Sequence, residues 1–147
     1  MKQSHRLPLI ALAVAAASIG MVAAYRWSTH APAPPDCRPG ALAYSRLELL
    51  FGLGRPGGGE VSEEEWRAFV ESEVTPRFPD GLTVLSGYGQ WRGPSGTIAK
   101  EPSRVLLIWY RRNDRTDAEI DAIRQAYKTK FAQESVLRVD GLSCASF

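Results

Sequence analysis

Apolar and polar residues follow the clearest pattern between Val61 and Arg92, where they predict a helix, a turn and a strand. Ser62 and Glu65 have the spacing of a capping box, in which each side chain binds the other residue's backbone amide. An apolar stripe at helical spacing comprises Trp66, Phe69, Val70 and Val74. Pro76 ends this helix, and the residues after the Pro-Asp-Gly turn that follows are typical of a strand.

Two further segments predict strands. Residues 41–51 alternate between apolar and polar side chains, as in a half-buried strand. Residues 105–110 (VLLIWY) are apolar throughout and are expected to form the central, most buried strand. A hairpin turn at residues 93–96 precedes this run, and Pro102 is expected to interrupt the pairing between the two.

A second helix and a last strand complete the pattern. Thr116 and Glu119 repeat the capping-box spacing. The apolar stripe of this helix comprises Ile120, Ile123, Tyr127 and Phe131. Residues 135–140 (SVLRVD) predict the last strand. The order β-α-β-β-α-β is that of the ferredoxin-like sandwich, an α+β fold in which right-handed crossovers place two helices on one face of a four-stranded antiparallel sheet and leave the other face open.

The beginning of the chain predicts export. Residues 1–24 join two basic residues to a long apolar run, which is typical of a signal peptide or of an N-terminal membrane anchor over residues 7–24. Small residues at the end of the run favour cleavage, whereas Tyr25-Arg26-Trp27 resembles the interfacial belt of an uncleaved anchor, so both alternatives stay open. Residues 25–39 form a Pro-rich linker, and residues 40–147 form one domain. We expect this domain outside the cytoplasm, in the periplasm or secreted.

Charge and composition exclude several classes of protein. The chain of 147 residues has 18 basic and 16 acidic side chains, and two of the basic ones precede residue 25, so the exported part is formally neutral. Without a basic stripe, a nucleic-acid partner is not expected. The two histidines of the chain, His5 and His30, lie outside the predicted domain, so this domain lacks the commonest general base and metal ligand. We therefore expect neither a metal site nor a cofactor.

Cys37 and Cys144 are the two cysteines of the chain. Because export places both in an oxidising compartment, where an even number of cysteines is usually paired, we predict a disulfide between them. In a ferredoxin-like sheet the first and last strands are antiparallel neighbours, so the beginning of the first lies beside the end of the last. Each cysteine lies a few residues outside one of these ends, and the topology therefore brings them together.

Several runs of the sequence resemble a bacterial exported family, the domain of unknown function 3574. These runs are LELLFGL at residues 47–53, residues 61–70, VTPRFPDGLTV at 74–84, GQWR at 89–92, residues 125–128 with Phe131, QESVLRVD at 133–140, and residues 144–147. The resemblance spans about residues 37–147. It implies export and a shared fold, but it assigns no reaction and no functional residue.

Strand parity supplies a candidate site. If the first and last strands pair, their charged side chains are expected to meet on the open sheet face, and polar residues of the second strand are expected on the same face. The six residues of this candidate ligand-binding site are Arg46, Glu48, Gln90, Arg92, Arg138 and Asp140. In a catalytic interpretation Glu48 or Asp140 would act as acid or base. The alternative is a set of cross-strand ion pairs on a solvated face.

Gly52, Gly54 and Gly57 match the G-x-G-x-x-G pattern of dinucleotide-binding loops. Pro56 stiffens the turn, and no acidic residue ends the next strand about 20 residues later, where such a site would need one. The glycines are therefore interpreted as a flexible loop between strand and helix.

No set of residues in this sequence specifies a reaction. We predict an exported binding or assembly module of the cell envelope, whose partner is a protein or a small ligand. The alternative is a small cofactor-free enzyme that uses the polar sheet face, by analogy with dimeric α/β-barrel enzymes. Two open faces packed in a homodimer would enclose a cavity, whereas a wet, shallow face favours binding or assembly. Membrane contact is expected only through the N-terminal segment, if that segment is uncleaved.

Overall fold

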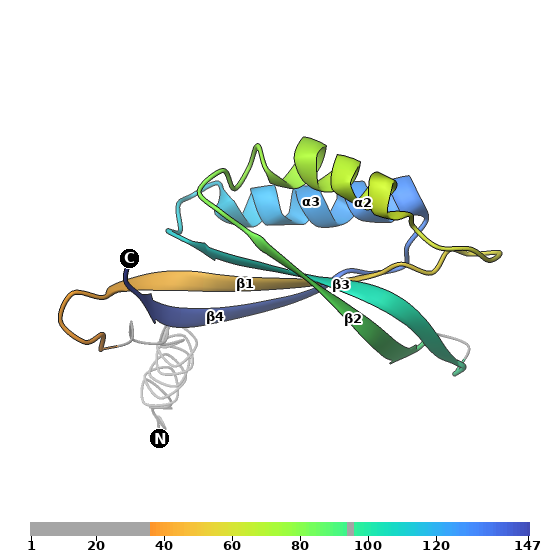
Figure 1. The fold of residues 1–147 in the computed structure, drawn as a ribbon, viewed down its shortest axis with the longest axis horizontal. Coiled ribbons are helices and arrows are strands. Elements are labelled where there is room, and N and C mark those ends of the chain that lie inside the picture. Colours follow the sequence, from red (N-terminus) through yellow and green to blue (C-terminus); the bar gives the residue numbers. More distant parts are fainter. Residues whose placement is uncertain (1–35, 94–95) are drawn as a thin grey trace, which may run out of the picture. The chain divides into compact units, whose positions relative to one another are not determined.

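The computed structural model describes residues 36–93 and 96–147, in which two helical segments cover one face of an antiparallel sheet (Figure 1). The strands are β1 (Leu42–Gly52), β2 (Thr83–Arg92), β3 (Ile98–Tyr110) and β4 (Leu137–Ala145). The helical segments are α2 (Glu63–Phe69), which continues as the π-helix η1 (Val70–Val74), and α3 (Thr116–Phe131). The strand order is β2-β3-β1-β4, and every pair is antiparallel. The predicted ferredoxin-like fold is therefore confirmed.

The predicted signal or anchor segment, and most of the predicted linker, lie outside the described residues. Within the part of the chain that the structure describes, no helix is both long enough and apolar enough to cross a membrane.

The predicted capping box begins α2. The Ser62 hydroxyl accepts a hydrogen bond from the Glu65 amide at 3.2 Å, and the Glu65 carboxylate accepts one from the Ser62 amide at 2.9 Å. The last turn then widens into η1, whose C-cap is Thr75, directly before Pro76. Since proline disfavours helical geometry in the residue before it, Pro76 sets the end of this segment.

The capping box predicted for α3 is wrong. Thr116 is the first helical residue rather than the cap, and Arg115, at the cap position, makes no side-chain capping bond. The Thr116 hydroxyl instead accepts a hydrogen bond from the Asn113 amide at 2.9 Å and donates one to the Asn113 side chain at 3.1 Å. Thr116 is buried, so the hydroxyl serves the turn that precedes the helix.

The interruption predicted at Pro102 is also wrong, because β3 runs through it without a break. A strand residue directs its N–H and its carbonyl to the same neighbour, and the Pro102 carbonyl accepts a hydrogen bond from the Leu53 amide at 3.0 Å, on the β1 side. The Leu53 carbonyl, which an N–H at position 102 would face, instead accepts a hydrogen bond from the Val61 amide at 2.8 Å, so the missing N–H of Pro102 leaves no acceptor unpaired.

The core lies between the sheet and the helices. Phe51 forms edge-to-face contacts with Trp66, Phe69 and Tyr127, at centroid distances of 5.1, 6.0 and 4.6 Å. Aromatic pairs in this geometry add to the stabilisation that burial provides. All four residues of the predicted α3 stripe are buried. The sheet contributes Leu47, Leu49, Phe51, Leu106, Ile108 and Tyr110 to this core.

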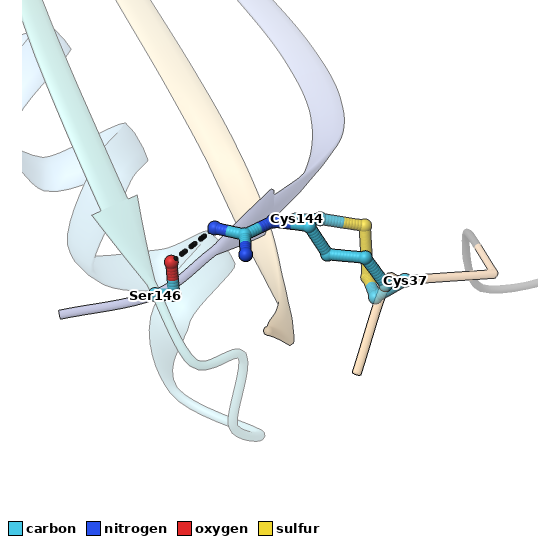
Figure 2. The surroundings of a disulfide bond; sticks show 4 residues. Cys37, Cys144 and Ser146 are labelled. Carbon is cyan, nitrogen blue, oxygen red and sulfur yellow. Dashed lines mark hydrogen bonds between the residues drawn. A yellow bond between two sulfur atoms is a disulfide. The ribbon is translucent and has the colours of Figure 1, made fainter. Parts of the chain in front are cut away.

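The predicted disulfide joins Cys37 to Cys144 (Figure 2). Their Cα atoms are 5.5 Å apart, although 107 positions separate them in the sequence. The pairing of β1 with β4 places Ala43 opposite Cys144 and so brings the two cysteines together as predicted. Cys144 itself lies inside β4 rather than beyond its end, because this strand is longer than the sequence indicated. Beside the disulfide, the Arg38 guanidinium donates a hydrogen bond to the Ser146 hydroxyl at 2.7 Å, drawn as the dashed line in Figure 2.

Candidate binding pocket at one end of the sheet

Arg46 and Glu48 lie on the open face of the sheet, as predicted. In the register of β1 with β3, Arg46 is opposite Trp109 and Glu48 is opposite Leu107. The two side chains form a salt bridge with each other at 2.8 Å, and the Arg46 guanidinium lies 6.0 Å from the centroid of the Trp109 ring. The charges of Arg46 and Glu48 are therefore paired by neighbouring groups of the same sheet face, although the Arg46 Nε is buried without a hydrogen-bond partner.

Arg138 and Asp140 do not join Arg46 and Glu48. The register places Arg138 opposite Leu49 and Asp140 opposite Leu47, and both leucines are fully buried on the helix-covered face. Even-numbered residues of β1 thus lie opposite odd-numbered residues of β4. An even-numbered residue of β1 and an even-numbered residue of β4 therefore lie on opposite faces of the sheet. The expectation that the four charged residues share one face is wrong, because parity within each strand says nothing of the offset between them.

On the helix side, Arg138 connects β4 to α3. It contacts Asp117 at 2.6 Å and Asp140 at 2.8 Å. Hydrogen bonds with Asp140, and secondly with Asp117, raise the pKa of Arg138. The same contact with Arg138, together with a hydrogen bond from Arg112, lowers the pKa of Asp117. Arg138 is therefore already paired with two carboxylates of its own chain.

Gln90 and Arg92 are also on a different face from the one predicted. They lie opposite Lys100 and Ile98, and they have the parity of Val84, which packs against the core. Gln90 nevertheless lines the pocket described next, whereas Arg92 is the last residue of β2 before the hairpin. The six residues predicted as one site are thus divided between two faces.

A pocket of about 220 Å³ lies where β1 ends and β4 begins. Residues of all four strands, and the segment between α3 and β4, form its walls. Its lining residues are Leu50, Phe51, Gly52, Gly89, Gln90, Trp91, Glu101, Ser103, Gln133, Glu134, Ser135 and Leu137. The pocket therefore combines apolar walls, two carboxylates and an indole ring, and none of its lining residues is basic.

Glycines make room for the polar side chains of this pocket. A Cβ atom on Gly52 would lie 2.5 Å from the Glu101 carboxylate, and one on Gly54 would lie 2.9 Å from it. A Cβ atom on Gly87 would lie 3.1 Å from the Ser103 hydroxyl. Glycine in a strand marks the close approach of another group. At Gly52, the last residue of β1, and at Gly87 in β2, that group is a side chain of β3.

Glu101 is held at the edge of the pocket by two neutral donors. Its carboxylate accepts a hydrogen bond from the Gly54 amide at 2.7 Å and one from the Trp91 indole N–H at 3.1 Å. Tyr127 of α3 fixes the same segment by donating to the Gly52 carbonyl at 2.8 Å. Burial, and secondly the negative charge of Glu101, raise the pKa of Tyr127, so this hydroxyl stays a donor at neutral pH.

Sequence reasoning missed Glu101 and Ser103. The assumption that Pro102 interrupts the strand concealed them, because their shared face follows only from a continuous strand. The available signal was the pair of glycines, Gly52 and Gly54, which were weighed only as part of a dinucleotide motif. Among the described residues, no group of three or more metal-binding side chains lies close enough to hold a metal ion.

The sequence profile of a family described as "Protein of unknown function (DUF3574)" matches residues 46–147, a range that contains the whole pocket. The chain belongs to this family. Three runs on which the DUF3574 resemblance rested, LELLFGL, GQWR and QESVLRVD, meet at the pocket and supply ten of its lining residues. None of the curated proteins matches the sequence of this DUF3574 chain.

Among solved structures, this DUF3574 domain is similar to a phage SAM lyase in complex with S-methyl-5'-thioadenosine. The TM-score is 0.57 at 13% sequence identity, over 77% of this chain and 95% of the lyase. The CutA protein of Synechococcus elongatus PCC7942 matches with a TM-score of 0.43 at 16% identity, over 72% of this chain and 83% of CutA. At such low identity, the likeness to the lyase indicates a shared fold and no shared activity.

Proposed function

We propose that this protein is an extracytoplasmic binding module that holds a small ligand in the pocket lined by Trp91 and Glu101. The observation that carries the proposal is the space that strand glycines leave around a carboxylate and an indole ring. Glycine in a strand costs stability, so the two strand glycines that line the pocket, Gly52 and Gly89, indicate that the hollow is useful. Concave sites that combine apolar walls with a few placed polar groups are the usual form of small-molecule sites.

Location outside the cytoplasm is supported by the disulfide, because such bonds persist in oxidising compartments. The apolar segment at the beginning of the chain supports it independently.

A library of small metabolites, screened by thermal shift against the full disulfide-bonded protein, tests the binding proposal. We expect at least one compound to raise the melting temperature and to lose this effect in Gly89→Val. Gly89 lines the pocket, and its nearest non-adjacent atom would be 3.8 Å from an added Cβ, so valine fills the hollow without a clash at the Cβ.

Gly141→Val is the matched control for this test. Gly141 is a strand glycine outside the pocket, and its added Cβ would lie 3.9 Å from the nearest atom. The control should bind as the unmodified protein does. The proposal is contradicted if no compound binds, or if binding survives Gly89→Val unchanged.

An enzyme at the same pocket is the second candidate function. Glu101 offers a carboxylate at the edge of a hollow, which is the placement that a general base requires. The phage lyase with the same fold is itself an enzyme, although this supports the candidate by analogy alone. Mass spectrometry of each binding compound after incubation separates the two functions. Conversion that is lost in Glu101→Gln supports an enzyme, and recovery of the unchanged compound supports a binding module.

A further inference from the structure

We propose that the pocket takes a small organic cation, a protonated amine attached to an apolar group, in preference to an anion or a neutral molecule. This inference rests on the proposed function and names the ligand class of the same site. It follows from the charge state of the pocket, from the faces that surround Glu101 and from the size of the space.

The charge of Glu101 lacks an opposite charge. The other partly buried carboxylates in the described part of the chain, Glu48, Glu65, Glu73 and Glu119, each lie within 2.6 to 4.0 Å of an arginine. Glu101 is also partly buried, yet it forms no salt bridge with any described residue. Its partners are a backbone amide and an indole N–H. Because charges removed from water are usually paired, a partly buried carboxylate without a basic partner leaves a place for a pairing group from outside the chain.

The carboxylate retains capacity for a further donor. Each carboxylate oxygen can accept about two hydrogen bonds, and each oxygen of Glu101 accepts one in this structure. An ammonium group offers three donors and a full positive charge. Glu101 lines the pocket, so an ammonium placed there would complete both the charge and the hydrogen bonds of this side chain.

The rest of the lining favours the same class of ligand. Glu134 supplies a second carboxylate, and no lysine, arginine or histidine lines the pocket, so an anion would meet like charge and no counter-charge. Trp91 supplies an aromatic ring, to which a cation is attracted. Leu50 and Leu137 supply apolar wall for the body of the molecule. Glu101 and Trp91 attract a cation, and Glu134 repels an anion, so all three residues favour a cationic ligand.

The volume limits the ligand to a small one. The pocket has a volume of about 220 Å³. Ordinary drug-sized ligands occupy sites of about 300 Å³ or more. A single ring or a short aliphatic chain that carries one amine fits this space.

Three probes of nearly equal size and different charge test the proposal: benzylamine, benzyl alcohol and benzoate at pH 7. Titrations of the full disulfide-bonded protein, followed by amide chemical shifts, give both the site and the dissociation constant. We expect benzylamine to shift Gly52, Trp91 and Ser135 and to bind at least about tenfold more tightly than the other two probes. Added salt should weaken benzylamine selectively, because its advantage is electrostatic.

Two variants assign the charge effect to Glu101. Glu101→Gln keeps the size of the side chain and removes its charge, so the preference for benzylamine should fall about tenfold or more. Glu64→Gln, an exposed residue of α2 outside the pocket, is the matched control and should bind as the unmodified protein does. If Glu101→Gln does not fold, the ranking of the three probes on the unmodified protein still decides the proposal.

The outcomes separate the ligand class from the pocket itself. Benzoate or benzyl alcohol bound at the same amides as tightly as benzylamine overturns the cation class and leaves the binding module intact. Binding by none of the three probes also overturns the cation class. The proposed function falls only if, in addition, no compound of the metabolite library binds in a way that Gly89→Val abolishes.

Discussion

The two ends of the β1–β4 pair in the sheet differ. Where β1 begins and β4 finishes, a disulfide joins the segment before β1 to β4. At the same end, Arg38 bonds to Ser146, and the rings of Tyr44 and Phe147 meet at a centroid distance of 6.1 Å. Where β1 finishes and β4 begins, glycines hold a space open beside a carboxylate that has neutral partners. Groups of the chain itself close the first end. At the second end, the pocket and the unpaired charge of Glu101 can accept a ligand.

The charged groups show the same contrast. Arg138 is bound by two carboxylates, and Asp117 is bound by two arginines, so their charges offset one another within the fold. Glu101 has no such partner among the described residues. A cluster of ion pairs is therefore a weaker indication of a binding site than a single unpaired carboxylate, because paired charges already have the opposite charge that a ligand would supply.

Removing the disulfide is the largest test of this comparison. Replacing Cys37 and Cys144 together by serine should lower the free energy of unfolding by up to about 4.7 kcal/mol, the chain-entropy limit for a loop of about 100 residues. Urea unfolding measures the loss. Because the pocket lies at the opposite end of the sheet, ligand binding should persist at temperatures where the variant stays folded, and its disappearance there would mean that the two ends are coupled.

Gly52→Ala should have the next largest effect. The new Cβ would lie 2.5 Å from the Glu101 carboxylate and would displace it from the Gly54 amide and the Trp91 indole. Leaving such a charged hydrogen-bond group without its partners costs about 1 to 3 kcal/mol. Unfolding by urea should show this loss, and titration should show weaker binding of any pocket ligand.

Gly141→Ala is the control for that substitution, since its Cβ would lie 3.9 Å from the nearest atom. It should change stability by no more than about 0.5 kcal/mol. Equal losses in the two variants would attribute the effect to β-strand glycine in general and would remove the close approach at Gly52 as its cause.

Acid should produce the smallest effect, through the paired carboxylates. Arg138 and Arg112 lower the pKa of Asp117 from its ordinary value of 3.8, and Arg104 and Arg67 lower that of Glu63 from 4.5. The folded protein therefore binds fewer protons than the unfolded chain near these values. The stability that these groups contribute is present above about pH 4.5 and is lost as the pH falls through their lowered pKa values.

Urea unfolding between pH 7 and pH 3 measures this loss. Both carboxylates are exposed, so 1 M salt should flatten the acid-dependent part of the profile. Asp117→Asn should remove the share that Arg138 and Arg112 provide. An unchanged profile in that variant would show that the contacts of Asp117 contribute nothing measurable to folding.

The sequence by itself determined the order of strands and helices, the capping box at Ser62 and the pairing of Cys37 with Cys144. These features depend on local spacing or on topology. Residues three or four positions apart share a helix face whatever surrounds them. Likewise, the first and last strands of this fold are neighbours in any ferredoxin-like sheet, so the cysteines beside their ends meet.

Only the tertiary structure decided which side chains share a face and which lie beside the pocket. The offset between β1 and β4 placed Arg138 and Asp140 with Leu49 and Leu47 instead of with Arg46 and Glu48. Period-two alternation fixes the faces within one strand, but a shift of one residue between strands reverses them. Glu101 was hidden for a related reason. Its proximity to Gly52 depends on the register between β1 and β3, and on Pro102, which the sheet accommodates because Val61 donates to the Leu53 carbonyl in its place.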